Sequence, residues 1–259
     1  MNFKDLEYVK TIVKDYSKIS SLSGSETNLM NTIIWDIDFT STTKTRSLYS
    51  IEVRKDCTFV KSLRNKSNTT IMIHIDRIPV APYQFTFDNG FWTGQNDNVI
   101  SVAIARWLIW KRLPFNFLFT TREEICANSY QILEFIKDHP EQDLIDLDID
   151  VTKDPVETTS GAVSIRKRDN QLQYPAEYVN RFTEICKREN IKYIHKDGHW
   201  LIVQLGMALH RLPKEELPKN FTYIGIPLIS YHSNHEIASE ECIKGVMKLL
   251  STYAKEQSK

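Results

Sequence analysis

The 259-residue sequence has no excess of charge of either sign, because 33 lysines and arginines balance 33 aspartates and glutamates. Without a basic block, electrostatics give no reason to expect nucleic acid or an anionic membrane as a partner. No apolar run reaches the length of a membrane span, and the amino-terminal twenty residues carry charges throughout, unlike a secretory signal. We therefore expect a cytoplasmic protein without nucleic-acid or membrane partners.

Cysteine is also scarce, and its four positions lie far apart in the chain: Cys57, Cys126, Cys186 and Cys242. No two of them have the CxxC spacing that is typical of metal or redox pairs, so we predict reduced thiols. The chain has no repeat and no low-complexity tract. The apolar content suits a soluble globular protein that can bury a sizeable core.

Segments of strand character alternate with segments of helical spacing along the chain. Apolar runs rich in β-branched and aromatic residues predict strands over 69–76, 113–119, 143–151 and 221–226, after two shorter ones within 44–64. Helices are expected over 3–17, from about residue 27, and over 97–110, 127–138, 176–190 and 235–253, whereas 152–175 reads as polar and turn-rich. The alternation predicts one three-layer α/β/α domain over 1–259, with a mixed, mainly parallel central sheet.

Polar side chains follow the predicted strands at the point where each strand ends. In parallel sheets ligands bind beyond the carboxyl ends of the strands, so these side chains should converge. Two imidazoles among several carboxylates suit zinc, manganese or cobalt. The candidates, in chain order, are His74, Asp76, Asp97, Glu123, Glu124, Asp148, Asp150, His232 and His235.

A carboxylate shared between two cations is the arrangement of two-metal hydrolases, and Asp97 is the natural candidate for that place. Each ion then needs about two further ligands, which leaves one carboxylate of the set free. A free carboxylate beside a metal-bound water acts as a general base. Asp97 also lies at the start of a predicted helix, where aspartate is a favoured cap, and it could fill both roles.

Five segments together resemble the ordered motifs of the co-catalytic zinc exopeptidases, the clan of the M28, M42 and M20 metallopeptidases. They are HID at 74–76, GQNDN at 94–98, TREEICA at 121–127, DVT at 150–152 and HSNHE at 232–236. DVT and HSxxE look most like the M42 aminopeptidases. Those proteins insert a β-rich domain between the first two motifs, whereas in this chain only residues 75–96 separate His74 from Asp97, which is closer to M28.

The resemblance implies a role for each site residue. His74 would bind the first ion, with Asp76 orienting its ring from behind. Asp97 would bridge the two ions. Asp150, or as a second choice Asp148, would complete the first ion's ligands, since the register of DLDID leaves both open.

On the same resemblance, Glu124 and His232 would bind the second ion and Glu123 would be the general base. A cis peptide bond is implied between Asp97 and Asn98. Arg122, directly before the two glutamates, departs from the usual pattern. Its side chain could point to solvent, or it could pair with Glu123 and weaken its basicity.

The resemblance implies a two-metal aminopeptidase that removes amino-terminal residues from short peptides, with metal-activated water as the nucleophile. Zinc is the expected metal, with cobalt or manganese as alternatives. Two other functions stay open: a different amide reaction on the same scaffold, as in glutaminyl cyclases, and an inactive binding module. The resemblance is compatible with a homo-oligomer.

Overall fold

The computed structural model describes residues 3–42, 48–63, 68–78, 85–152, 154–169, 172–198, 204–233 and 235–258. Its centre is a mixed sheet whose middle strands are parallel and buried on both faces, as their unbroken apolar sequences require. The central strands are β6 (Asn116–Thr120), β3 (Thr69–His74), β7 (Asp143–Val151) and β11 (Phe221–Ile229).

Antiparallel strands extend this parallel centre on both sides. On one side the sheet continues through β2 (Cys57–Ser62) to β1 (Tyr49–Val53). On the other side it continues through β12 (Glu236–Ser239) and β5 (Phe91–Gly94) to β4 (Thr86–Asp88). A branch leaves β11 through β8 (Val163–Asp169), which pairs with β9 (Leu172–Gln173) and β10 (Tyr193–Gly198).

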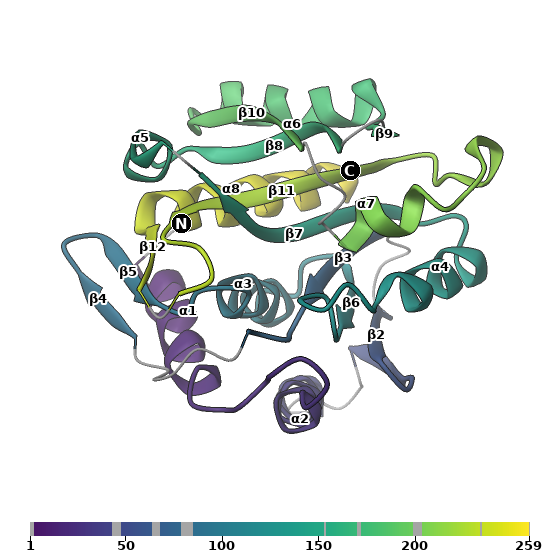
Figure 1. Cartoon of the computed structure of the whole chain (residues 1–259), viewed down its shortest axis with the longest axis horizontal. Coiled ribbons are helices and arrows are strands. Elements are labelled where there is room, and N and C mark those ends of the chain that lie inside the picture. Colours follow the sequence, from purple (N-terminus) through teal and green to yellow (C-terminus); the bar gives the residue numbers. More distant parts are fainter. Residues whose placement is uncertain are drawn as a thin grey trace.

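Helices cover both faces of the sheet (Figure 1). Tyr253 of α8 contacts Thr69, whereas Gln204 of α7 contacts Asp146, and these two strand residues point to opposite faces because side chains alternate along a strand. The α/β class, with a mixed and centrally parallel sheet, is therefore confirmed. The helices are α1 (Phe3–Tyr16), α2 (Thr27–Thr42), α3 (Val99–Trp110), α4 (Ser129–Asp138), α5 (Pro155–Thr159), α6 (Ala176–Arg188), α7 (Gln204–Leu209) and α8 (Glu240–Gln257).

Two sequence-based predictions of elements were wrong. The stretch 152–175 is not all turns, because it holds α5, β8 and β9. The charged residue Arg166 made β8 look like an exposed loop, but its guanidinium is buried and paired with Asp150. The last helix begins at Glu240 rather than at 235, since Ser239 caps it by accepting a bond from the N–H of Glu241. Residues 236–239 form β12 instead, a strand that places part of the candidate site.

None of the described helices is long and apolar enough to cross a membrane. The predicted strand pair within 44–64 corresponds to β1 and β2. Residues 44–47 and 64, at the two ends of that prediction, lie outside the described residues.

Candidate metal centre

The carboxyl ends of β3 and β7 bring the first imidazole beside a carboxylate. These strands are parallel, with Met72 opposite Asp146, so the next residues on the same face, His74 and Asp148, lie side by side. The Nε2 atom of His74 is 3.1 Å from Oδ1 of Asp148. The same nitrogen is 3.2 Å from Oδ1 of Asp97, which precedes α3. One ring nitrogen therefore faces two carboxylates.

A second imidazole–carboxylate pair lies next to the first. Glu124, in the turn after β6, approaches His232, after β11, with 3.1 Å between Oε2 and Nε2. One ligand atom from each of His74, Asp97 and Glu124 lies within 4.8 Å of the others. Asp97 thus lies close to both His74 and Glu124. A ligand shared between two cations needs such a position. We refer to His74, Asp97, Glu124, Asp148 and His232 as the cluster.

Asp76 anchors the cluster from behind. Its Oδ1 lies 3.4 Å from Nδ1 of His74, the ring nitrogen that faces away from the other acids. It also accepts hydrogen bonds from the backbone N–H groups of Glu123 and Glu124, both at 3.0 Å, and from the Ser23 hydroxyl. Burial disfavours its charged form, yet these contacts hold the pKa of Asp76 below its ordinary value. One carboxylate therefore orients both the histidine and the turn that carries the two glutamates.

Burial and close packing of like charges shift the pKa values of the residues in and beside the cluster. Burial and the neighbouring acids Asp148 and Glu124 raise the pKa of Asp97 well above its ordinary value. Burial and the same two acids also raise the pKa of Glu123. Burial alone would lower the pKa of His74, but the charges of Asp148 and Glu123 raise it well above the usual value. Carboxyl groups crowded around one imidazole repel one another when charged, so they tend to stay protonated. A bound cation would offset this repulsion and displace the protons.

The donor set fits a pair of divalent cations. Among the described residues, Oε1 of Glu124 is buried and has no hydrogen-bond donor, while Oδ1 of Asp97 faces the imidazole of His74 at 3.2 Å. Buried carboxylate oxygens without a donor are costly unless a cation satisfies them. Two imidazoles and three carboxylates are a ligand set that zinc, cobalt or manganese accepts. His74 and Asp148 would serve one ion, Glu124 and His232 the other, and Asp97 both.

Asp150, the first choice from sequence for the first ion, does not lie in the cluster. Its carboxylate receives hydrogen bonds from Ser164 and from Arg166, whose Nη2 lies 3.1 Å away. The side chain points to the same face as Asp148, but it lies beyond the level of His74 and is neutralised by the arginine of β8. The strand pairing therefore places Asp148, rather than Asp150, beside His74.

Arg122, which departs from the motif pattern, does not pair with Glu123. Arg122 has a positive φ of 61°, and its guanidinium lies 3.4 Å from Asp56, so it points away from the cluster. The implied cis bond between Asp97 and Asn98 is present. Asn98, not Asp97, occupies the cap position of α3, and no side-chain bond is made there. The carboxylate of Asp97 is thus not used as a helix cap.

Two residues that bear on the site were missed. Ser23 contacts Asp76, and Glu236 accepts bonds from the backbones on both sides of the cluster. Glu236 lies in the HSNHE segment, and Ser23 lies in SLSGSE, directly before the predicted second helix. The signal for Glu236 was a carboxylate four residues after a candidate ligand. It was read as part of the last helix, where a glutamate needs no further explanation.

The ion pair of Asp150 extends to Asp169, and this predicts a pH dependence of stability. Burial raises the pKa of Asp169 to about 6, although Arg166 opposes the shift. Unfolded aspartate titrates near pH 4, so the folded chain binds more protons between about pH 4 and 6. The contribution of Asp169 to the free energy of unfolding therefore falls as pH rises through that window, by on the order of 2 kcal/mol.

Asp169→Asn should remove this contribution, so that variant and parent differ in the slope of stability against pH. Urea unfolding at several values from pH 4 to 7 measures the difference. Asp197→Asn is the control, because Asp197 is paired with Arg168 at the surface of neighbouring β10. Parallel curves for the parent and Asp169→Asn would contradict the assignment.

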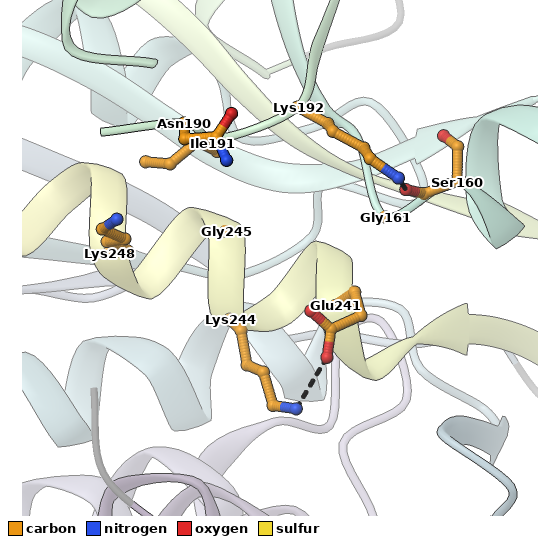
Figure 2. Close-up of a pocket in the computed structure, with 9 residues that line it drawn as sticks. All are labelled: Ser160, Gly161, Asn190, Ile191, Lys192, Glu241, Lys244, Gly245 and Lys248. Atoms are coloured by element: carbon orange, nitrogen blue, oxygen red, sulfur yellow. Dashed lines mark hydrogen bonds and ion pairs between the residues drawn. The ribbon is translucent and has the colours of Figure 1, made fainter. Parts of the chain in front are cut away.

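A separate cavity of about 320 Å³ lies beside α8 (Figure 2). Lys192 donates to the carbonyl of Ser160 across it, while Lys244 is paired with Glu241. Lys248 donates to the carbonyl of Glu189. None of the cluster residues lines this cavity. Its lysines are satisfied by the chain itself, so it adds nothing to the candidate metal centre.

Comparison with solved structures shows where this architecture occurs. The structure of an aminopeptidase from Desulfurococcus kamchatkensis aligns with 98% of this chain and with 96% of its own chain, at 11% identity and a TM-score of 0.75. The TET1 peptidase of Pyrococcus horikoshii covers 95% over 99% of its own, at 13% identity and a TM-score of 0.72. A dinuclear metal-binding peptidase of the M20 family from Bacillus subtilis covers 98% over 98%, at 13% identity and 0.68.

No family model matches the sequence, and no curated protein matches it. The structural likeness nevertheless extends over nearly the whole chain. It shows that the chain has the fold shared by these aminopeptidases and dinuclear metallopeptidases, so the resemblance to the co-catalytic exopeptidases is confirmed for the fold. At such low sequence identity, the similarity shows the fold of this chain and not its function.

Proposed function

We propose that the chain is a two-metal aminopeptidase that removes amino-terminal residues from short peptides. One observation carries the proposal: residues from five separate segments place two imidazoles and three carboxylates together beside a further buried acid. The peptidase-like fold supports the same reading. Two zinc ions are the proposed cofactor, with cobalt or manganese as alternatives.

The proposed ligands are His74 and Asp148 for one ion, Glu124 and His232 for the other, and Asp97 between them. Bound cations would polarise the scissile carbonyl and lower the pKa of a water molecule. Asp148 replaces Asp150 in this assignment because of its contact with His74. Asp76 holds the ring of His74 and the backbone of the glutamate turn in place.

Glu123 is the proposed general base. It is buried next to the cluster, and burial raises its pKa well above the ordinary value although His74 opposes this. A carboxylate with a raised pKa is a stronger proton acceptor than an exposed one. Glu123 would take a proton from the attacking water and deliver it to the leaving amine. Its backbone N–H is fixed by Asp76, which limits where the carboxylate can reach.

Removal of metal tests the proposal. Chelation should abolish release of amino-terminal residues from a short peptide, zinc should restore it, and metal analysis should find two ions per chain. The same peptide with an acetylated amino terminus is the control substrate and should resist hydrolysis. Cyclisation of an amino-terminal glutamine with one ion per chain would favour a glutaminyl-cyclase-like enzyme. Metal uptake without turnover of any peptide would favour a binding module.

We also propose an oligomeric state and a cellular location for this chain. The Pyrococcus horikoshii TET1 peptidase assembles into a tetrahedron or an octahedral shell. We propose a homo-oligomer for this chain as well, which light scattering would measure. We also propose a cytoplasmic location, because Cys57, Cys126, Cys186 and Cys242 are free, as expected in a reducing compartment.

A further inference from the structure

Glu236 joins the two segments that carry Asp97 and His232. Its Oε2 accepts hydrogen bonds from the backbone N–H groups of Asn96 at 2.6 Å and Asp97 at 3.0 Å. Its Oε1 accepts one from the backbone N–H of His232 at 2.8 Å. The side chain is fully buried on β12, although no other function of the site requires a carboxylate there.

A second set of bonds fixes the same segment. The side-chain amide of Asn96 donates to the backbone carbonyl of Glu236 at 2.7 Å and to that of Trp92 at 3.2 Å. The residue before Asp97 is therefore bound to β12 through backbone and side chain together. On the other side His232 has a positive φ of 56°, a conformation that an ordinary residue keeps only when its surroundings hold it.

We infer that Glu236 is a positioning residue that fixes the spacing between Asp97 and His232, and so sets the affinity of the site for its second cation. The inference rests on the proposed function. All three partners of the carboxylate are donors, so both oxygens must accept. A glutamine would turn an N–H₂ group toward at least one donor and release one of the two segments. The first cation shares Asp97 but keeps two further ligands, His74 and Asp148, that Glu236 does not touch, whereas the second keeps only Glu124.

The test is a zinc titration against a chromophoric chelator. The parent should bind two ions, and Glu236→Gln should bind the second about 10- to 100-fold more weakly while the first stays within about threefold. His232→Asn identifies which of the two affinities belongs to the second ion. Ser239→Ala, at the end of the same strand, removes only the cap of α8; it should lower thermal stability and leave both affinities unchanged.

The possible results are distinct. Two ions bound by Glu236→Gln with parental affinities would overturn the inference and leave the proposed function standing. Equal weakening of both ions would also overturn it, because a general loss of structure does not select one site. A parent that binds no zinc would refute the function and the inference together. Should Glu236→Gln fail to fold, Asn96→Ala loosens the same segment and carries the same expectation.

Discussion

Replacement of Glu123 by glutamine should leave two ions bound and reduce the turnover number by about 10²- to 10⁴-fold, the usual contribution of a positioned proton carrier. The carboxylate makes no ion pair with Arg122, which contacts Asp56 instead. Its basicity is thus set by burial and by the cluster. Glutamine has almost the same shape, so KM should change little. Steady-state hydrolysis of a short peptide, together with metal analysis, measures both effects.

The neighbouring Glu124 provides the matched control for this experiment. Glu124→Gln makes the same chemical change one residue along the same turn, but it removes the partner of His232. We expect this variant to lose one ion, whereas Glu123→Gln keeps both. Hydrolysis at the parental rate by Glu123→Gln would refute its role as base. Loss of metal from Glu123→Gln would instead make it a ligand.

Substitution of Asp148 by asparagine should lower the affinity for the first ion by more than the roughly 10- to 100-fold that loss of an outer partner costs. Asp148 contacts His74 directly, so its charge would be lost from the first ion's ligands. The chain should remain folded, because removal of one of several crowded acids relieves repulsion. Zinc affinity and thermal melting of the metal-free protein report these two effects separately.

Asp150→Asn is the corresponding change two residues away and should behave in the opposite manner. It should retain both ions and lower the free energy of unfolding by about 3 kcal/mol, because it leaves Arg166 buried with a weakened partner. Urea unfolding measures this loss. If Asp150→Asn loses metal and Asp148→Asn keeps it, the assignment derived from the strand register is reversed.

Much of the fold could be predicted because its central strands are unmistakable in sequence. Segments such as TTIMIH and NFLFT are apolar, β-branched or aromatic throughout, and no helical spacing competes with them. The strand β8 could not be predicted in the same way. Its sequence VSIRKRD looks exposed, and only the tertiary partner Asp150 explains why Arg166 is tolerated inside.

The candidate site was predictable in its residue types and less so in its register. Candidates such as His74 and His232 could be selected from the sequence because each follows an apolar run. Asp148 and Asp150 face the same side, so the choice between them depends on how β7 is aligned with β3, which one strand's sequence does not contain. Glu236 was missed for a related reason, since two of its three backbone partners lie 139 and 140 residues away in the chain.

The pairing of β12 with β5 joins residues around 94 to residues around 236. A chain emerging from the ribosome therefore exposes His74, Asp97 and both glutamates long before His232 and Glu236 exist to complete their surroundings. Contacts so distant in sequence form late in folding. On the proposed function, the chain could hold two cations, and so act on peptides, only after the segment around residue 236 has been synthesised and has paired with β5.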